Sequence, residues 1–407
     1  MAIKQWVLEK PEEPEGFETS TNGQKVCKLK KSLYGVKQSS RQWNRKFNMF
    51  LESVGLQSTD SDPCLYTNKT QDVFFALYVD DGLLAAQDDH VLTSIITVMK
   101  EEFKVTVGKA EYFVGLQIER TSSQIFLHQQ AYTKRILQRF GMSNASPVRT
   151  AADACNKLKL ACGSERADDV PYRELVGSVM FLMVSTRPDI AYAVSSLSKY
   201  LDKHQKEHWT AAKRLLRYLN GTQKYGIRFG GSSPLVGFCD ADFAGDEDSR
   251  HSHTGLVFIF NNGPLTWLSQ SQSTVSTSTC EAELTAAFAA TKEAIWLKRL
   301  LSEVGYNRGG PVKLFIDNQG TIKYIQNPLM NNHKRSKHWD IRFKFTKEME
   351  ASGVIKVEYV PTTEQLADIL TKPLTAELFT QNVKKLNMLP VADKFSLSGS
   401  VGNPART

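Results

Sequence analysis

Four acidic residues in the second half of the chain lie at the borders of predicted secondary structure: two directly follow strands, and two lie in helices. The four residues are Asp240, Glu283, Asp317 and Asp368. The first and third directly follow apolar strands predicted over 235–239 and 312–316. The second lies early in an amphipathic helix predicted over 281–304, and the fourth lies in a closing helix predicted over 363–370. Because strand ends and helix starts meet at one edge of an α/β sheet, we expect these carboxylates to converge there.

The order of the predicted elements around these acids indicates the fold class. Three strands are followed by a helix, a strand, two helices, a strand and a last helix. The remaining predicted strands cover 255–260, 265–268 and 354–360, and the remaining helices cover 321–326 and 338–351. This order predicts an α/β (α+β) unit with a mixed sheet flanked by helices. In it, the strands that end at Asp240 and Asp317 should be neighbours.

Four carboxylates gathered at one sheet edge would repel one another unless cations lay between them. Two hard divalent ions roughly 3.5–4 Å apart would relieve the repulsion and could support phosphodiester hydrolysis. Mg²⁺ fits an all-oxygen ligand set without His or Cys, and Mn²⁺ is a candidate substitute. The alternative is that these are ordinary surface acids, since Asp is common at strand ends and helix caps.

The sequence from about 235 to 374 resembles the ribonuclease H domain of copia-type LTR retrotransposons. The matching segments are 237–242 (GFCDAD), 279–284 (TCEAEL), 315–319 (FIDNQ), 338–342 (HWDIR) and 365–374 (QLADILTKPL). The resemblance implies a two-metal enzyme that cuts the RNA strand of RNA–DNA hybrids, with metal-binding carboxylates at Asp240, Glu283, Asp317 and Asp368. Asp242 and Glu281 are near-duplicates that we do not prefer, because Asp240 directly follows its predicted strand and Glu283 fits the general ribonuclease H pattern.

The first half contains a second pair of acids, Asp80 and Asp81, between two apolar runs. The runs over 73–79 and 83–86 predict a β-hairpin with an Asp-Gly turn. The tetrapeptide YVDD at 78–81 resembles the reverse-transcriptase palm signature, whose hairpin presents metal-binding carboxylates. Further matches to copia-type reverse transcriptase and its connection lie at 28–38, 61–66, 112–118 and 170–219.

A reverse transcriptase also needs a metal-binding Asp on an earlier strand, and no Asp precedes Asp60 in this chain. The segment at 14–17 matches the stretch that follows that strand in the family, so we expect the chain to start just after it. The palm is therefore expected to be partial and inactive as a polymerase on its own. Asp80 and Asp81 would be relics unless another chain supplied the missing half.

Basic residues interleaved with aromatic ones predict contacts with nucleic acid. The net charge is +8, from 51 Lys and Arg against 43 Asp and Glu, and cationic side chains neutralise phosphates while aromatic rings stack on bases. The candidates are Lys30, Lys31, Tyr34, Gly35, Lys37, Gln38, Arg41, His333, Lys334, Arg335, Lys337 and His338. The alternative is a solvated basic face, with Trp43 and Trp339 in the core.

Composition changes along the chain predict its organisation. We expect an acidic, Pro-rich lead-in, a partial reverse transcriptase, a connection, a ribonuclease H-like domain and a flexible tail. The corresponding ranges are 1–24, 25–143, 144–232, 233–374 and 375–407. No secretory signal or membrane-spanning run is visible, and the cysteines are scattered. We therefore expect an intracellular protein, cytoplasmic (in virus-like particles if the element is active) or nuclear.

Three functional hypotheses follow. The first is an RNA–DNA hybrid ribonuclease left in a truncated copia-type Pol protein. The second is a retrotransposon-derived protein that binds nucleic acid without turnover, and the third is one part of a split RNA-directed DNA polymerase. The expected partners are RNA–DNA hybrid, DNA and RNA, together with other Pol or Gag products of such an element. The four intact acids favour the first hypothesis, and the missing palm Asp disfavours the third.

Overall fold

The computed structural model forms two compact units. The described residues are 4–7, 28–31, 36–160, 166, 169–306, 309–327 and 337–390, with side chains described except at 4–7, 28–31 and 337–340. One unit comprises Met1–Val114 and Trp296–Asn307, and the other comprises Gly115–Ile295 and Arg308–Thr407. The four candidate acids Asp240, Glu283, Asp317 and Asp368 all fall in the second unit.

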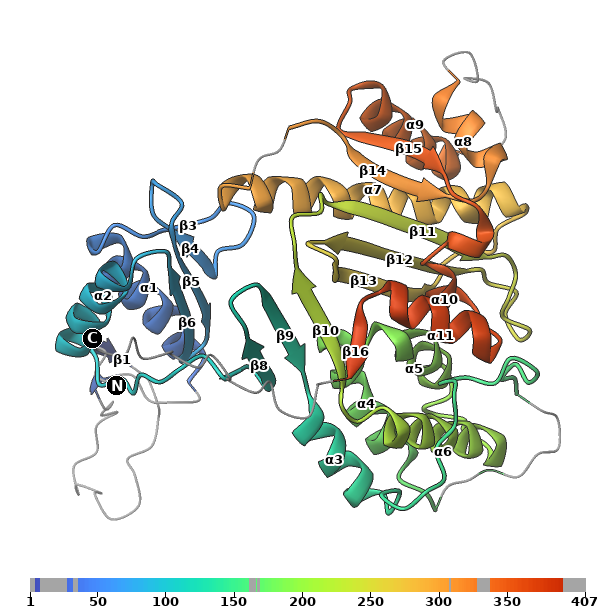
Figure 1. Ribbon diagram of the computed structural model, residues 1–407, viewed down its shortest axis with the longest axis horizontal. Helices are drawn as coiled ribbons and strands as arrows, with labels where there is room; N and C mark the ends of the chain where they lie inside the picture. Colours follow the sequence, from blue (N-terminus) through green and yellow to red (C-terminus); the bar gives the residue numbers. More distant parts are fainter. Residues whose placement is uncertain are drawn as a thin grey trace, which may run out of the picture. The chain divides into compact units, whose positions relative to one another are not determined.

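A five-stranded mixed sheet organises the second unit, in the order β13-β12-β11-β14-β15 (Figure 1). The strands are β11 (Val236–Asp242), β12 (His253–Phe260), β13 (Gly263–Ser271), β14 (Val312–Ile316) and β15 (Ile355–Tyr359). The pairs β13–β12 and β12–β11 are antiparallel, whereas β11–β14 and β14–β15 are parallel. This confirms the predicted mixed sheet, with β11 and β14 as neighbours.

Helices cover both faces of this sheet. They are α7 (Thr279–Glu303), α8 (Gln319–Gln326), α9 (Lys337–Ala351) and the single-turn α10 (Asp368–Thr371). Along β12, Leu256 lines a pocket with Ala289 of α7, whereas a Cβ on Gly255 would lie 2.6 Å from Cγ2 of Thr371 in α10. Since successive strand residues point to opposite faces, α7 and α10 lie on opposite sides of the sheet.

Three local expectations differ from the structure. Strand β11 continues through Asp242, so Asp240 lies inside a strand, where it pairs with Gly255. The closing helix is broken into a 3-10 turn (Thr362–Glu364) and α10. The prediction of a flexible tail over 375–407 is wrong for the first part of that range. This part forms α11 (Ala376–Lys385), in which Phe379 and Val383 are buried, and β16 (Met388–Pro390). The rest of that tail lies outside the described residues.

The segment between the two halves also belongs to the second unit. Its strands are β8 (Leu116–Arg120), β9 (Gln124–His128) and β10 (Tyr225–Gly230), which form a sheet in the order β16-β10-β9-β8. Its helices are α3 (Gln130–Arg139), α4 (Tyr172–Ser185), α5 (Ala191–Ser198) and α6 (Lys206–Gly221), with a 3-10 turn at Pro188–Ile190. These helices share one apolar core with α10, α11 and β16.

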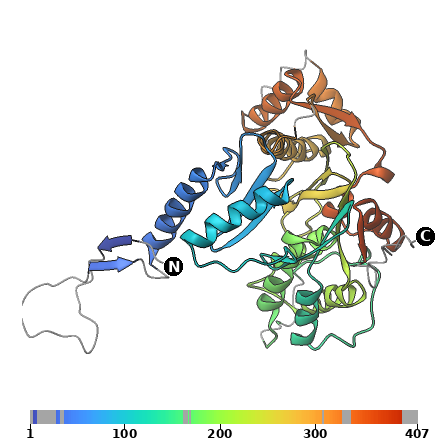
Figure 2. The same ribbon diagram turned by 60° about the vertical axis from the view of Figure 1, so that its left-hand side comes forward.

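The first unit is built on a four-stranded antiparallel sheet, in the order β3-β4-β5-β6. Its elements are α1 (Lys37–Ser53), β3 (Gln57–Ser58), β4 (Leu65–Thr67), β5 (Val73–Tyr78), β6 (Asp81–Ala86), α2 (Asp89–Glu102) and a short β7 (Tyr112–Phe113). Alternate residues of β5 are buried and share one core with α1 and α2, so both helices cover the same face (Figure 2, blue and cyan). Separately, β1 (Lys4–Val7), within the expected lead-in, pairs with β2 (Lys28–Lys31).

Two further observations concern the whole described part of the chain. None of its helices combines the length and apolar character needed to cross a membrane. Its four cysteines, Cys64, Cys155, Cys239 and Cys280, are free thiols.

Candidate functional site

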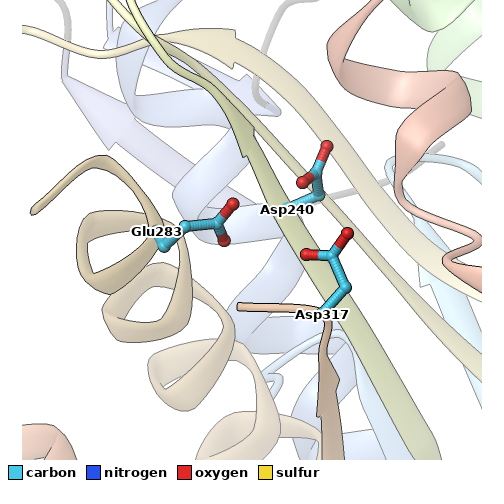
Figure 3. Close-up of side chains that lie close together, drawn as sticks. All are labelled: Asp240, Glu283 and Asp317. Carbon is cyan, nitrogen blue, oxygen red and sulfur yellow. The ribbon is translucent and has the colours of Figure 1, made fainter. Parts of the chain in front are cut away.

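Three of the four predicted acids meet at one end of the mixed sheet. Asp240 comes from β11, Glu283 from the second turn of α7, and Asp317 directly follows β14. One carboxylate oxygen from each lies within 4.8 Å of the others, and Figure 3 shows the three carboxylates pointing toward a common space. The expected convergence therefore occurs for these three residues.

Burial makes this group electrostatically costly without a cation. The exposed fractions of Asp240 and Glu283 are only 3% and 6%, and the Oε2 atom of Glu283 is buried without a hydrogen-bond partner. Burial, followed by the charges of Asp240 and Asp317, raises the pKa of Glu283 well above its usual value. An orphaned carboxylate oxygen beside two others is the donor set that a hard divalent ion takes, so these residues fit a divalent metal.

The fourth acid, Asp368, lies beside the group and is not a member of it. It begins α10, on the face of the sheet opposite α7, and is 7% exposed. Burial first, and then the charge of Asp240, raises the pKa of Asp368 to about 7, although Lys372 acts in the opposite direction. The predicted set of four is thus three convergent acids with Asp368 adjacent to Asp240.

Hydroxyl groups hold two of the carboxylates in place. The buried Thr371 donates its hydroxyl proton to Oδ2 of Asp240 at 2.5 Å, and Thr362 donates to Oδ2 of Asp317 at 2.8 Å. Sequence reasoning missed both threonines, together with Lys372, whose Nζ lies 2.9 Å from Oδ1 of Asp368. A signal existed for Lys372, because an acid and a lysine four residues apart face each other on a helical turn.

The two near-duplicate acids have other partners. Asp242 forms an ion pair with Lys157, at 3.3 Å between Nζ and Oδ2. Glu281 accepts hydrogen bonds from the backbone N–H and the hydroxyl of Thr277, at 2.7 and 2.8 Å. Neither belongs to the convergent group, so the geometry favours Asp240 and Glu283 as the candidate ligands.

Asp80 and Asp81 of the first unit lie on the predicted hairpin, but the turn of this hairpin is shifted. Tyr78 pairs with Asp81, so Val79 and Asp80 form the turn in place of the expected Asp-Gly pair. Val79 adopts a φ of 56°, a left-handed conformation that is unfavourable for a β-branched residue. The indole N–H of Trp43 donates to the carbonyl oxygen of Val79 at 2.5 Å and helps to hold it.

Asp80 and Asp81 are both exposed at this turn. Among the described residues, only Asp240, Glu283 and Asp317 form a group of three or more His, Cys, Asp or Glu side chains close enough to share a metal ion. The hairpin acids therefore lack a third acidic ligand in the described part of the chain.

The predicted nucleic-acid contacts are only partly placed. Lys37, Gln38 and Arg41 lie exposed on the first turns of α1. Lys30 and Lys31 lie in β2, and Lys337 and His338 begin α9, but their side chains are not among those described. The remaining candidates, Tyr34, Gly35, His333, Lys334 and Arg335, lie outside the described residues.

The fold and the sites together define a class: a two-unit chain with an acidic β-hairpin in one unit and, in the other, a mixed sheet that gathers three carboxylates suited to a divalent metal. A family model described as reverse transcriptase (RNA-dependent DNA polymerase) matches residues 7–154. The Pol polyprotein of transposon TNT 1-94 from Nicotiana tabacum is 42% identical over 381 residues, which cover 90% of this chain and 28% of that protein. A transposon Ty5-1 protein of Saccharomyces cerevisiae is 30% identical over 264 residues, covering 63% of this chain and 86% of that protein.

The chain belongs to the copia-type retrotransposon Pol polyproteins. It spans about a quarter of the length of its plant relatives, 28% for the tobacco protein and 26% for an Arabidopsis thaliana one. Among solved structures, a foamy viral protease-reverse transcriptase in complex with double-stranded DNA is similar at 13% identity. That match has a TM-score of 0.47 and covers 82% of this chain and 51% of the other.

Proposed function

We propose that the second unit is a ribonuclease H that hydrolyses the RNA strand of RNA–DNA hybrids. The observation that carries this proposal is the convergence of Asp240, Glu283 and Asp317 within 4.8 Å, with one buried oxygen of Glu283 left unpartnered. Surface acids without a function would point into solvent, where each could be hydrated separately. Their burial in one group is costly unless a cation is bound.

We propose Mg²⁺ as the natural ion, with Mn²⁺ as a substitute, because every candidate ligand atom is a carboxylate oxygen. Asp240, Glu283 and Asp317 would hold the ions, with Asp368 as a fourth ligand beside Asp240. When bound, two such ions activate a water for attack on the phosphodiester and stabilise the leaving oxygen.

The chain's own residues prepare this site. The hydroxyls of Thr371 and Thr362 fix the carboxylates of Asp240 and Asp317, which lowers the cost of ordering them when an ion binds. The raised pKa of Glu283 means that this group must release its proton before it can coordinate metal. Metal binding to the site should therefore strengthen as pH rises.

The wider role follows from the family. We propose that the basic residues 30–41 and 333–338 contact hybrid, DNA or RNA through phosphates. The partial palm is proposed to lack polymerase activity in this 407-residue chain, because Asp80 and Asp81 lack a third acidic ligand among the described residues. The boundaries 25–143, 144–232 and 233–374, an intracellular location, and Pol or Gag partners are further parts of this proposal.

A matched pair of variants tests the catalytic assignment. Glu283→Gln removes a convergent carboxylate, whereas Glu281→Gln changes an acid on the same helix that bonds Thr277 instead. With Mg²⁺ and a labelled RNA–DNA duplex, Glu283→Gln should reduce cleavage by at least about a hundredfold, and Glu281→Gln should cleave nearly as the wild type does. Asp317→Asn should behave as Glu283→Gln does and still bind hybrid, since phosphate contacts come from basic residues.

Two outcomes would reject this assignment. Cleavage by Glu283→Gln or Asp317→Asn at the wild-type rate would show that the site is wrongly identified. A wild-type chain that binds hybrid but never cleaves it, in Mg²⁺ or Mn²⁺, would favour the nucleic-acid-binding hypothesis instead.

A further inference from the structure

A lysine stands directly against the acidic group. Lys372 follows the last residue of α10, and the single turn of this helix brings its side chain back over Asp368. Its Nζ atom lies 2.9 Å from Oδ1 of Asp368 and 3.8 Å from Oδ2 of Asp240. The lysine side chain is 32% exposed, whereas those of Asp368 and Asp240 are 9% and 4% exposed. The ammonium group therefore closes the solvent side of a buried carboxylate pair.

The four carboxylates, Asp240, Glu283, Asp317 and Asp368, form an acidic group with two halves that differ in their contact with the Lys372 ammonium. On one half, the ammonium of Lys372 faces Asp240 and Asp368 and offsets part of their negative charge. On the other, Asp240, Glu283 and Asp317 face one another, and among the described side chains no ion pair links Glu283 or Asp317 to a lysine or arginine. Asp240 belongs to both halves.

We propose that Lys372 is a positioning residue that fixes the order in which divalent ions enter the site. Resting on the proposed metal site, the inference is that a first ion binds among Asp240, Glu283 and Asp317, where the Lys372 ammonium makes only its longer contact, 3.8 Å to Asp240. A second ion, on Asp240 and Asp368, can bind only after the Lys372 ammonium has left those oxygens. The lysine thus keeps the Asp240–Asp368 pair assembled in the metal-free chain and weakens the second ion position.

The geometry supplies the reason for this order. An ammonium and a metal ion both seek the same carboxylate oxygens, and a like charge a few ångströms away opposes the binding of a divalent ion. Thr371 meanwhile donates to the same Oδ2 of Asp240 that Lys372 faces. Its neutral hydroxyl can keep Asp240 oriented when the ammonium moves away, so the first half of the group stays intact.

Mn²⁺ titration of the full-length chain tests the inference, with free Mn²⁺ measured by electron paramagnetic resonance in the absence of nucleic acid. The wild type should bind one ion tightly and a second more weakly. Lys372→Met should strengthen the second binding step by about tenfold or more, since one opposing charge is removed. Lys372→Arg keeps the charge and should behave as the wild type does.

The control is Lys313→Met, which also removes an ion-paired lysine. Lys313 pairs with Glu358 at 3.1 Å on the neighbouring strand, and its loss should leave both Mn²⁺ steps unchanged. A purely structural role for Lys372 would lower stability and would not tighten metal binding. Binding curves for folded Lys372→Met that coincide with the wild type, or that are weaker, overturn the inference.

A second measurement needs no variant and uses the wild-type chain. Acylation of lysines, read by mass spectrometry, should modify Lys372 slowly in EDTA and several times faster at saturating Mn²⁺, because the ammonium is then released from Asp368. Unchanged reactivity at saturating Mn²⁺ overturns the inference while leaving the ribonuclease proposal intact. If the chain binds no Mn²⁺ at an Asp317-dependent site, both proposals fail together.

Discussion

Removing the titratable group at Asp368 should change how the stability of the metal-free chain depends on pH. Burial and the charge of Asp240 raise the pKa of Asp368 from 3.8 to about 7. The native state therefore holds this proton more tightly than the unfolded state. The stability that this tighter proton binding gives to the native state is fully present below the unfolded pKa and is lost as pH rises through about 7. Asp368→Asn cannot titrate, so it should lack this loss.

The expected magnitude follows from the size of the shift. Between pH 5 and the folded pKa of about 7, Asp368 is protonated in the native state and ionised in the unfolded state. Across this interval of about two pH units, the free energy of unfolding changes by about 1.4 kcal/mol for each unit. The unfolding free energy of the wild type should therefore fall by about 3 kcal/mol, relative to Asp368→Asn, between pH 5 and pH 8. Glu283, whose pKa is also raised, contributes in the same direction in both proteins and cancels in the difference, apart from any coupling between the two acids.

Urea unfolding in EDTA, at several values between pH 5 and pH 8, measures this difference. Other titrating groups affect both proteins, so only the gap between their unfolding free energies matters. A gap that stays constant across this range would refute the reasoning, because it would show that Asp368 is ionised in the native chain throughout. Added Mg²⁺ should stabilise the wild type more at pH 8 than at pH 5, since a carboxylate must lose its proton to bind metal.

Two smaller predictions concern the neighbours of this site and the palm. Thr371→Val removes the hydroxyl that holds Asp240. It should lower the free energy of unfolding by about 1–3 kcal/mol and slow hybrid cleavage, while Thr371→Ser should retain most activity. Equal cleavage by the two variants would contradict this. The chain alone should not extend a primer on an RNA template, and Asp80→Asn should leave hybrid cleavage unchanged. Template-dependent extension by homogeneous protein, or a large loss of cleavage in a folded Asp80→Asn variant, would show that the hairpin takes part.

The sheet around the site could be predicted from sequence because its strands are short apolar runs with clear ends. The predicted strand at 312–316 coincides with β14, and the helix predicted over 281–304 differs from α7 by only one or two residues at each end. Two parallel neighbours then place Asp240 and Asp317 at the same sheet edge. For these elements the local pattern and the tertiary packing favour the same structure.

Where the prediction failed, a distant contact outweighed the local pattern. The sequence Asp81-Gly82 is a strong turn signal, yet the turn falls at Val79 and Asp80, where the indole of Trp43 binds the Val79 carbonyl. In the supposed tail, Phe379, Val383 and Leu386 have helical spacing and enter the common core. That signal was present, but three apolar residues in a polar segment become decisive only when a core is available to receive them.

The position of the fourth acid depends on a residue that carries no charge. Asp240 pairs in register with Gly255, and a Cβ at Gly255 would lie 2.6 Å from Cγ2 of Thr371 and 2.9 Å from the carbonyl oxygen of Ala367. Backbone atoms cannot yield as a flexible side chain can, so a larger residue would push α10 away from the sheet. Asp368, Thr371 and Lys372 would then withdraw from Asp240 together. The information that completes the acidic group therefore lies partly in a glycine on the neighbouring strand, which a search for acidic residues alone does not consider.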